Sequence, residues 1–125
     1  MNTTRLFIVC ITLATASFAH AQTPISVAPA ELVSEYRANP IAANRRLAGK
    51  SVIITGAISG IDEAKPVTAV ISFGGAWDGY LVNAYTTEDT AAELSIGQNV
   101  TLQCDSVRRG KTFAPDVIAE SCRIL

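Results

Sequence analysis

The residues best suited to contact a ligand lie between positions 108 and 115. Arg108, Arg109 and Lys111 bring three cations together, and Phe113 adds an aromatic ring. Guanidinium and ammonium groups attract carboxylates and phosphates, and an aromatic ring can stack on a base. This composition is therefore typical of a surface for an acidic ligand or a single nucleic-acid strand. The alternative is a solvated hairpin tip from which Phe113 folds back onto the core.

Trp77 and Tyr80 are a second pair of candidate contact residues. They lie within and just after a glycine-rich segment at 74–79, which predicts a tight connection between two strands. A Trp or Tyr at a surface can anchor a partner, because its ring is large and carries a polar group. The alternative, which the pattern favours, is that Trp77 packs across one end of the core.

Residues 1–21 have the three parts of a secretory signal peptide. Arg5 supplies a basic start, residues 6–18 form an apolar run, and Ala19-His20-Ala21 matches an A-x-A cleavage site. The apolar run is shorter than the ~20 residues of a comfortable membrane span. We expect cleavage between Ala21 and Gln22, and a periplasmic or secreted protein with no transmembrane segment after cleavage.

Few side chains outside the signal offer catalytic or metal chemistry. His20 is the only histidine, so the mature chain can hold no Ser-His-Asp site, no Cys-His site and no imidazole metal ligand. Carboxylates such as Asp105 and Asp116 show no spacing that brings them together. We therefore predict a protein that is not an enzyme and has no cofactor and no metal. Loss of Arg5 also leaves an excess of acidic residues, which does not favour nucleic acid as a partner.

Cys104 and Cys122 are the two cysteines that remain after the signal. An even number of cysteines in an exported chain predicts a disulfide, because export leads to an oxidising compartment. The alternative is a pair of free, buried thiols. A catalytic or metal-binding role is not indicated, since the C-x-x-C spacing is absent.

The first part of the mature chain has a helical pattern. Residues 22–28 are expected to form a mobile leader, and the helical pattern extends from Ser26 to Ala48 with Pro29 in its first turn. Asn39-Pro40 interrupts this pattern, because the residue before a proline is disfavoured in the helical region. We therefore predict a two-part helix that packs on the rest of the domain.

From residue 50 onward the apolar residues recur with a period of two. Strands are expected at 51–59, 66–73, 80–85, 99–107 and 116–124, with a polar turn at 60–65 and a short helix between Thr87 and Gly97. Gly56 predicts a bend in the first strand. Cys122 is in phase with Ile118, and Cys104 with its own apolar neighbours, which supports the disulfide.

Five strands, with one helix between the third and fourth and a helical segment in front, have the element order of the OB-fold. The predicted fold class is therefore mainly β, a five-stranded Greek-key barrel. Over residues 29–124 the chain resembles the tRNA-anticodon-domain-like OB-fold family, whose members are small exported bacterial proteins. The resemblance rests on Glu31-Leu32, Tyr36, Asn39, Ala42-Ala43, Gly49-Lys50-Ser51-Val52, Thr55-Gly56, Ile58, Leu94 and Gly97-Gln98-Asn99-Val100.

The resemblance implies a single OB-fold domain over residues 29–125 that includes the N-terminal helix. It transfers no catalytic residue, because the family label describes an architecture and not a demonstrated activity. OB-folds bind ligands across their second and third strands and through the adjoining loops. We therefore expect an exported, non-catalytic binding or interaction module. Its contact face would comprise those strands and the loop at 108–115, and its partner would be an envelope protein or an acidic ligand.

Two other function classes stay open. A protein that binds single-stranded nucleic acid or another polyanion would lose affinity steeply as salt is added. A structural envelope-stress factor would bind no small ligand and would reveal itself through a stress phenotype.

Overall fold

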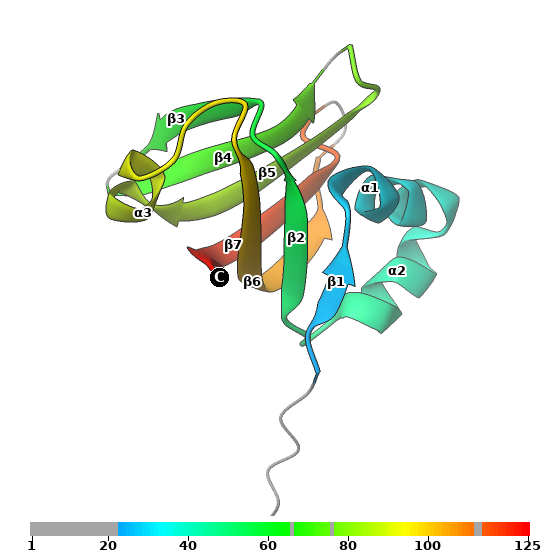
Figure 1. Cartoon of the computed structure of the whole chain (residues 1–125). Helices are drawn as coiled ribbons and strands as arrows, with labels where there is room; N and C mark the ends of the chain where they lie inside the picture. Colours follow the sequence, from blue (N-terminus) through cyan, green and yellow to red (C-terminus); the bar gives the residue numbers. More distant parts are fainter. Residues whose placement is uncertain (1–22, 66, 76, 112–113) are drawn as a thin grey trace, which may run out of the picture.

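The computed structural model of the protein describes residues 23–65, 67–75, 77–111 and 114–125. The predicted signal peptide and Phe113 lie outside these ranges. Within them the chain forms seven strands and three helices (Figure 1). In chain order these are β1 (Ile25–Val27), α1 (Pro29–Ala38), α2 (Pro40–Leu47), β2 (Val52–Ala57), β3 (Gly60–Ala64), β4 (Thr68–Gly75), β5 (Tyr80–Thr87), α3 (Glu88–Ala92), β6 (Asn99–Arg109) and β7 (Val117–Ile124).

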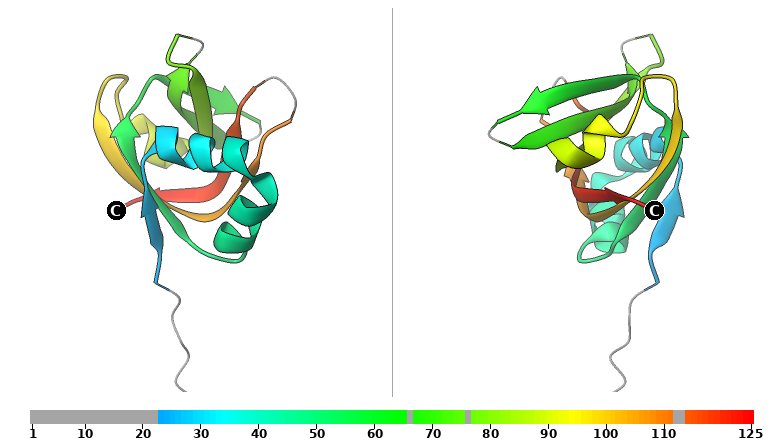
Figure 2. Two further views of the ribbon diagram at one scale, coloured as in Figure 1. Left: turned by 90° about the vertical axis from the view of Figure 1, so that its right-hand side faces the viewer. Right: turned by 60° about the vertical axis from the view of Figure 1, so that its left-hand side comes forward.

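All of these strands belong to one sheet with the spatial order β1-β2-β6-β7-β5-β4-β3. The β1–β2 and β5–β7 pairs are parallel, and the other neighbours are antiparallel. The sheet is strongly curved, and α1 and α2 lie together at one side of it (Figures 1 and 2). The pairing leaves the sheet open between β1 and β3. A mainly β fold with a few helices is confirmed, whereas closure into a five-stranded barrel stays a prediction.

The expected first strand at 51–59 is shorter in the structure, because β2 ends at Ala57 and β3 begins only at Gly60. The Ile58 N–H donates to the carbonyl of Gln98 at 2.9 Å, and the Ser59 N–H donates to the carbonyl of Ser72 at 2.8 Å. The chain thus changes partner between β2, which pairs with β6, and β3, which pairs with β4. The predicted polar turn at 60–65 is wrong. Its charged residues Asp62 and Glu63 belong to β3, an edge strand, where exposed charges are tolerated and even useful.

The expected leader at 22–28 contains a strand. Ile25–Val27 forms β1, which pairs in parallel with the first half of β2. Ile25 and Val27 pack against the core, so their alternation with the exposed Ser26 is the signature of a short strand. For the same reason α1 begins at Pro29 and not at Ser26.

The two-part helix is confirmed, and it breaks at Asn39-Pro40. Asn39 caps α2, because its side-chain oxygen accepts the Ala42 N–H at 3.1 Å, and Pro40 occupies the first turn. α1 buries Leu32, Val33 and Tyr36 against the sheet. The rest of the core comes from both helices and from the inner face of the sheet. Its largest fully buried side chains include Phe73, Leu32, Leu47, Ile54, Ile58, Ile71 and Leu102.

Removal of the Asn39 cap is expected to destabilise the protein. Asn39→Ala leaves a backbone N–H of α2 without its partner, which typically costs about 1 kcal/mol. Urea denaturation followed by circular dichroism would measure the loss. Asn44→Ala is the matched control, because Asn44 lies exposed within the same helix. An equal loss in both variants would show that the cap contributes nothing.

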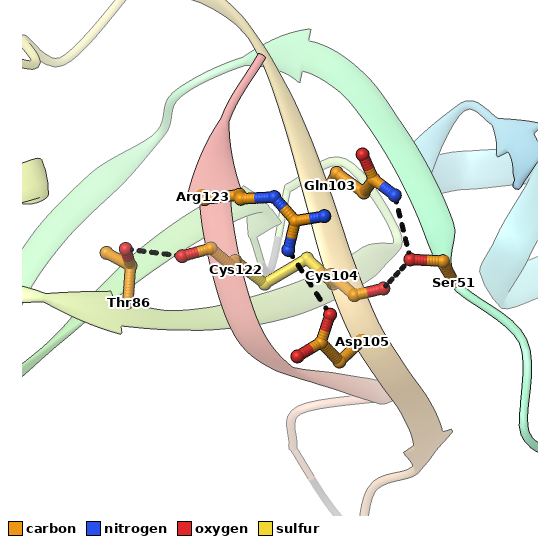
Figure 3. Close-up of a disulfide and its surroundings, with 7 residues drawn as sticks. All are labelled: Ser51, Thr86, Gln103, Cys104, Asp105, Cys122 and Arg123. Atoms are coloured by element: carbon orange, nitrogen blue, oxygen red, sulfur yellow. Dashed lines mark hydrogen bonds and ion pairs between the residues drawn. A yellow bond between two sulfur atoms is a disulfide. The ribbon is translucent and has the colours of Figure 1, made fainter.

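The disulfide between Cys104 and Cys122 is present and joins two residues directly opposite each other in β6 and β7 (Figure 3). Both cysteines are buried. The predicted phase of the last strand is partly wrong, since Val117 and Ala119 face the core and Ile118 faces the other side. The cause is Ser121, whose φ of 53° is rare for a residue with a side chain. This backbone conformation interrupts the alternation of inward and outward side chains, so the residues before and after Ser121 are out of phase.

Candidate functional site

The loop between β6 and β7 is fixed at its base by backbone hydrogen bonds. The Gly110 N–H donates to the carbonyl of Asp116 at 2.9 Å, which closes the loop. The Asp116 N–H donates to the carbonyl of Leu81 at 2.9 Å, and the Leu81 N–H donates to Asp116 Oδ2 at 2.8 Å. Asp116 therefore ties the start of β7 to the start of β5 and holds the loop in place.

Helix α1 meets this loop and forms a cleft with it. Arg37 Nη2 donates to Asp116 Oδ1 at 2.9 Å, so the last turn of α1 is joined to the base of the loop. A cleft of about 500 Å³ lies between the two elements. We call it the cationic cleft, and its lining residues are Val33, Tyr36, Arg37, Arg109, Gly110, Lys111, Pro115 and Asp116.

The charge of the cleft is positive. Arg37, Arg109 and Lys111 line it together with a single carboxylate, Asp116. Both oxygens of Asp116 are already engaged, one by Arg37 and the other by the Leu81 N–H. In the described part of the chain, no carboxylate lies within ion-pair distance of Arg109 or Lys111. An anion that enters the cleft would therefore meet two cations whose charge is not neutralised locally.

Tyr36 is the buried polar residue of the cleft. Only 3% of its surface is exposed, and its hydroxyl has no hydrogen-bond partner among the residues that the structure describes. Burial raises the pKa of Tyr36, and the nearby charge of Glu35 raises that pKa further. The hydroxyl therefore keeps its proton at neutral pH and can act as a donor.

Arg108 does not join Arg109 and Lys111. Neighbouring residues of a strand point to opposite faces, and Arg108 lies on the outer face of β6. There its guanidinium pairs with Glu120 at 3.2 Å. It lines a second depression of about 720 Å³, the outer groove, which comprises Thr68, Tyr85, Thr86, Thr87, Arg108, Glu120, Ser121 and Cys122. The cluster predicted from sequence is thus split between two surfaces, and Phe113 falls outside the described residues.

Trp77 and Tyr80 have different environments. Trp77 lies in the turn between β4 and β5 and is 102% exposed, so the prediction that it packs across the end of the core is wrong. Tyr80 packs against the core and against Gly74, whose φ is 77° and where an added Cβ would overlap Tyr80. The β4–β5 turn and the β6–β7 loop lie at the same end of the molecule (Figures 1 and 2).

Residues 8–117 match the tRNA_anti-like family. The chain belongs to this family. The match covers most of the chain, including helix α1 and the loop between β6 and β7, which line the cationic cleft. No curated protein sequence matches this tRNA_anti-like chain.

Solved structures share the fold of this tRNA_anti-like chain at low sequence identity. One is a lipoprotein from Klebsiella pneumoniae subsp. pneumoniae MGH 78578, described as a "putative nucleic acid-binding lipoprotein". It has a TM-score of 0.64 and 14% identity, with 82% of this chain and 92% of that chain covered. Another is described as a "putative aspartyl-tRNA synthetase" from Leishmania major Friedlin. It has a TM-score of 0.53 and 14% identity, with 89% of this chain and 22% of that chain covered.

The sequence of this tRNA_anti-like chain does not indicate that Tyr36 and Arg37 are site residues. Tyr36 belongs to the apolar stripe of a helix, which predicts a core position, and Arg37 has the pattern of an ordinary solvated side chain. Asp116 was a candidate carboxylate without a partner. Arg37 and Asp116 are 79 residues apart, so no local pattern brings them together. A charged residue directly after a buried tyrosine is the one weak local signal.

Other kinds of site are not found in the described part of this tRNA_anti-like chain. Residues 23–65, 67–75, 77–111 and 114–125 contain no group of three or more His, Cys, Asp or Glu side chains that could hold a metal ion. No helix within these ranges is both long enough and apolar enough to cross a membrane.

Proposed function

We propose that this protein is an exported, non-catalytic binding module that takes an anionic ligand in the cationic cleft. The observation that carries this proposal is the convergence of Arg37, Arg109 and Lys111 on one cleft that holds a single carboxylate. The signal-like pattern of residues 1–21 supports export to the periplasm or the medium. The likeness to a lipoprotein agrees with a position in the cell envelope.

The contact face of this module extends from the cleft onto β4 and β5. We infer that β2 and β3 together act as the long first strand of an OB barrel, since only Ile58 and Ser59 separate them. β4 and β5 are then the second and third strands, on which OB-folds bind ligands. Their outer side carries Tyr85 and the hydrogen-bonded pair of Ser72 and Asn83, at 3.0 Å.

Binding of single-stranded nucleic acid is the second candidate function. Trp77 is exposed in the β4–β5 turn, which lies at the same end of the molecule as the β6–β7 loop, and offers a ring on which a base can stack. The Klebsiella pneumoniae neighbour, described as a "putative nucleic acid-binding lipoprotein", points in the same direction. The overall excess of acidic residues points against it, because a nucleic acid is repelled by the net charge. We therefore rank a compact or peptide-borne anion first.

Reversal of the cleft charges tests the proposed function. Isothermal titration calorimetry with glycerol phosphate, oligoglutamate and oligothymidylate would show which anion the protein binds. Arg109→Glu/Lys111→Glu is expected to lower the affinity for the bound probe by about tenfold or more, because two charge-assisted contacts become repulsive. Oligothymidylate would in addition lose affinity steeply with added salt.

Arg45→Glu/Lys50→Glu is the matched control for this charge reversal. It changes the net charge by the same amount, but neither residue lines the cleft. The control is expected to bind as the unmodified protein does. If both variants lost the same affinity, the cause would be the net charge of the protein and not the charges of the cleft. If none of the three probes bound the unmodified protein, the structural envelope role would take the place of the proposed function.

A further inference from the structure

The Tyr36 hydroxyl is the one buried side-chain polar atom in the described ranges that lacks a hydrogen-bond partner. A buried hydroxyl without a partner destabilises a folded protein, and such groups are rare. Phenylalanine would fill the same space without that cost. A tyrosine at this position is therefore explained better by a task in binding than by packing in the core.

The position of Tyr36 indicates where its partner would come from. Tyr36 lines the same cleft as Arg37, Arg109 and Lys111, so a ligand held by these cations is next to the ring. The hydroxyl is closed off from solvent, and a ligand reaches it when a lining side chain moves aside. Arg37 lines the cleft with a side chain that is more than half exposed, and its movement would open its ion pair with Asp116. Because its hydroxyl stays protonated, Tyr36 offers an anion a donor.

The charge of the cleft indicates the class of anion. Three cations and the single carboxylate of Asp116 leave an excess of two positive charges. A phosphate monoester has close to two negative charges and three terminal oxygens, which suits several donors arriving from different sides. A single carboxylate has one charge and two oxygens and would leave part of this set unused.

We propose that the cationic cleft is a phosphate site in which the Tyr36 hydroxyl donates a hydrogen bond to an oxygen of a phosphate monoester held by Arg109 and Lys111. This inference rests on the proposed function and gives its ligand class. Tyr36 is a binding residue whose hydroxyl gains its partner only in the complex. The phosphate can belong to a small metabolite or to the end of a nucleic-acid strand, since both present the same group.

Tyr36→Phe tests this site because it has opposite effects on the free and the bound protein. Without ligand, the variant is expected to raise Tm by ~5 °C, since an unsatisfied hydroxyl is removed from the interior. With glycerol phosphate as the probe, it is expected to raise the dissociation constant by about tenfold, because a hydrogen bond to a charged group is lost. Nuclear magnetic resonance titration and thermal unfolding would measure the two effects.

Thr55→Val is the matched control, because it removes an exposed hydroxyl on β2 that lines neither the cationic cleft nor the outer groove. It is expected to bind glycerol phosphate as the unmodified protein does. Oligothymidylate with and without a terminal phosphate distinguishes the two sources of the group. Tighter binding of the oligothymidylate with a terminal phosphate would indicate that the phosphate group belongs to a nucleic acid. Equal binding of the oligothymidylates with and without that phosphate would overturn the phosphate site in favour of a polyanion surface.

Failure of this inference can be told apart from failure of the proposed function. If Arg109→Glu/Lys111→Glu abolished binding of a probe but Tyr36→Phe did not change it, the anion-binding function would stand and the role of Tyr36 would fall. If succinate bound more tightly than glycerol phosphate, the cleft would be a dicarboxylate site instead. If no anion bound at all, both would be overturned.

Discussion

Replacement of both cysteines by alanine is expected to lower the free energy of unfolding by about 3 kcal/mol. The disulfide joins residues that are 18 positions apart, so its loss frees the β6–β7 hairpin in the unfolded chain. Hydrogen bonds continue outward from the pair on both sides. Thr86 donates to the Cys122 carbonyl at 2.7 Å, and Ser51 donates to the Cys104 carbonyl at 3.3 Å (Figure 3). The cross-link therefore stabilises the middle of the sheet.

Guanidinium denaturation of Cys104→Ala/Cys122→Ala beside the unmodified protein would measure this loss. Both proteins are compared with and without a reductant. The reductant should destabilise the unmodified protein by a similar amount and leave the double variant unchanged. If the unmodified protein had the same midpoint in both conditions, the disulfide would contribute nothing to stability.

Gly110→Ala is expected to cost about 2 kcal/mol or more and to reshape the cationic cleft. A Cβ at this position would overlap the carbonyl oxygen of Pro115, which is backbone and cannot rotate away. Relief requires the two ends of the loop to separate, and this breaks the hydrogen bond from the Gly110 N–H to Asp116. Lys111 and the ion pair of Arg37 with Asp116 would then lose their relative positions.

Thermal unfolding and amide resonances would check both effects of Gly110→Ala. The largest shifts are expected at residues 109–111 and 116, and affinity for glycerol phosphate should fall with them. Gly60→Ala is the control, since a Cβ there meets Ser72 at an ordinary contact distance of 3.6 Å. A Gly110→Ala protein with unchanged stability and unchanged resonances would contradict the tight closure of this loop.

Local chemistry was sufficient to predict much of the fold. Asn39-Pro40 predicts the break between α1 and α2, because both the cap and the proline act within one turn. The even pair of Cys104 and Cys122 predicts the disulfide. The strand β3 was missed, because an edge strand has little apolar signal of its own. The phase of β7 was missed because Ser121 adopts a backbone conformation that its residue type does not announce.

The candidate site was predictable only in part. The cations of residues 109 and 111 are visible in the sequence, since they occur close together in one loop. Their counterpart in α1 is not visible, because Arg37 reaches the loop only after the sheet has brought the helix there. For Trp77, a candidate contact residue, the sequence pattern favours packing across one end of the core, because its ring is large. Its exposure follows from the course of the β4–β5 turn, which tertiary structure decides.

The alternation of β6 has a consequence for how this family can diversify. Arg108 and Arg109 are adjacent in the chain, yet one lies in the outer groove beside Glu120 and the other in the cationic cleft. A substitution at either position alters one surface and spares the other. An insertion of one residue in this strand would exchange the two arginines between the surfaces. Point substitutions in this strand can therefore diversify the charge of one surface while that of the other stays unchanged.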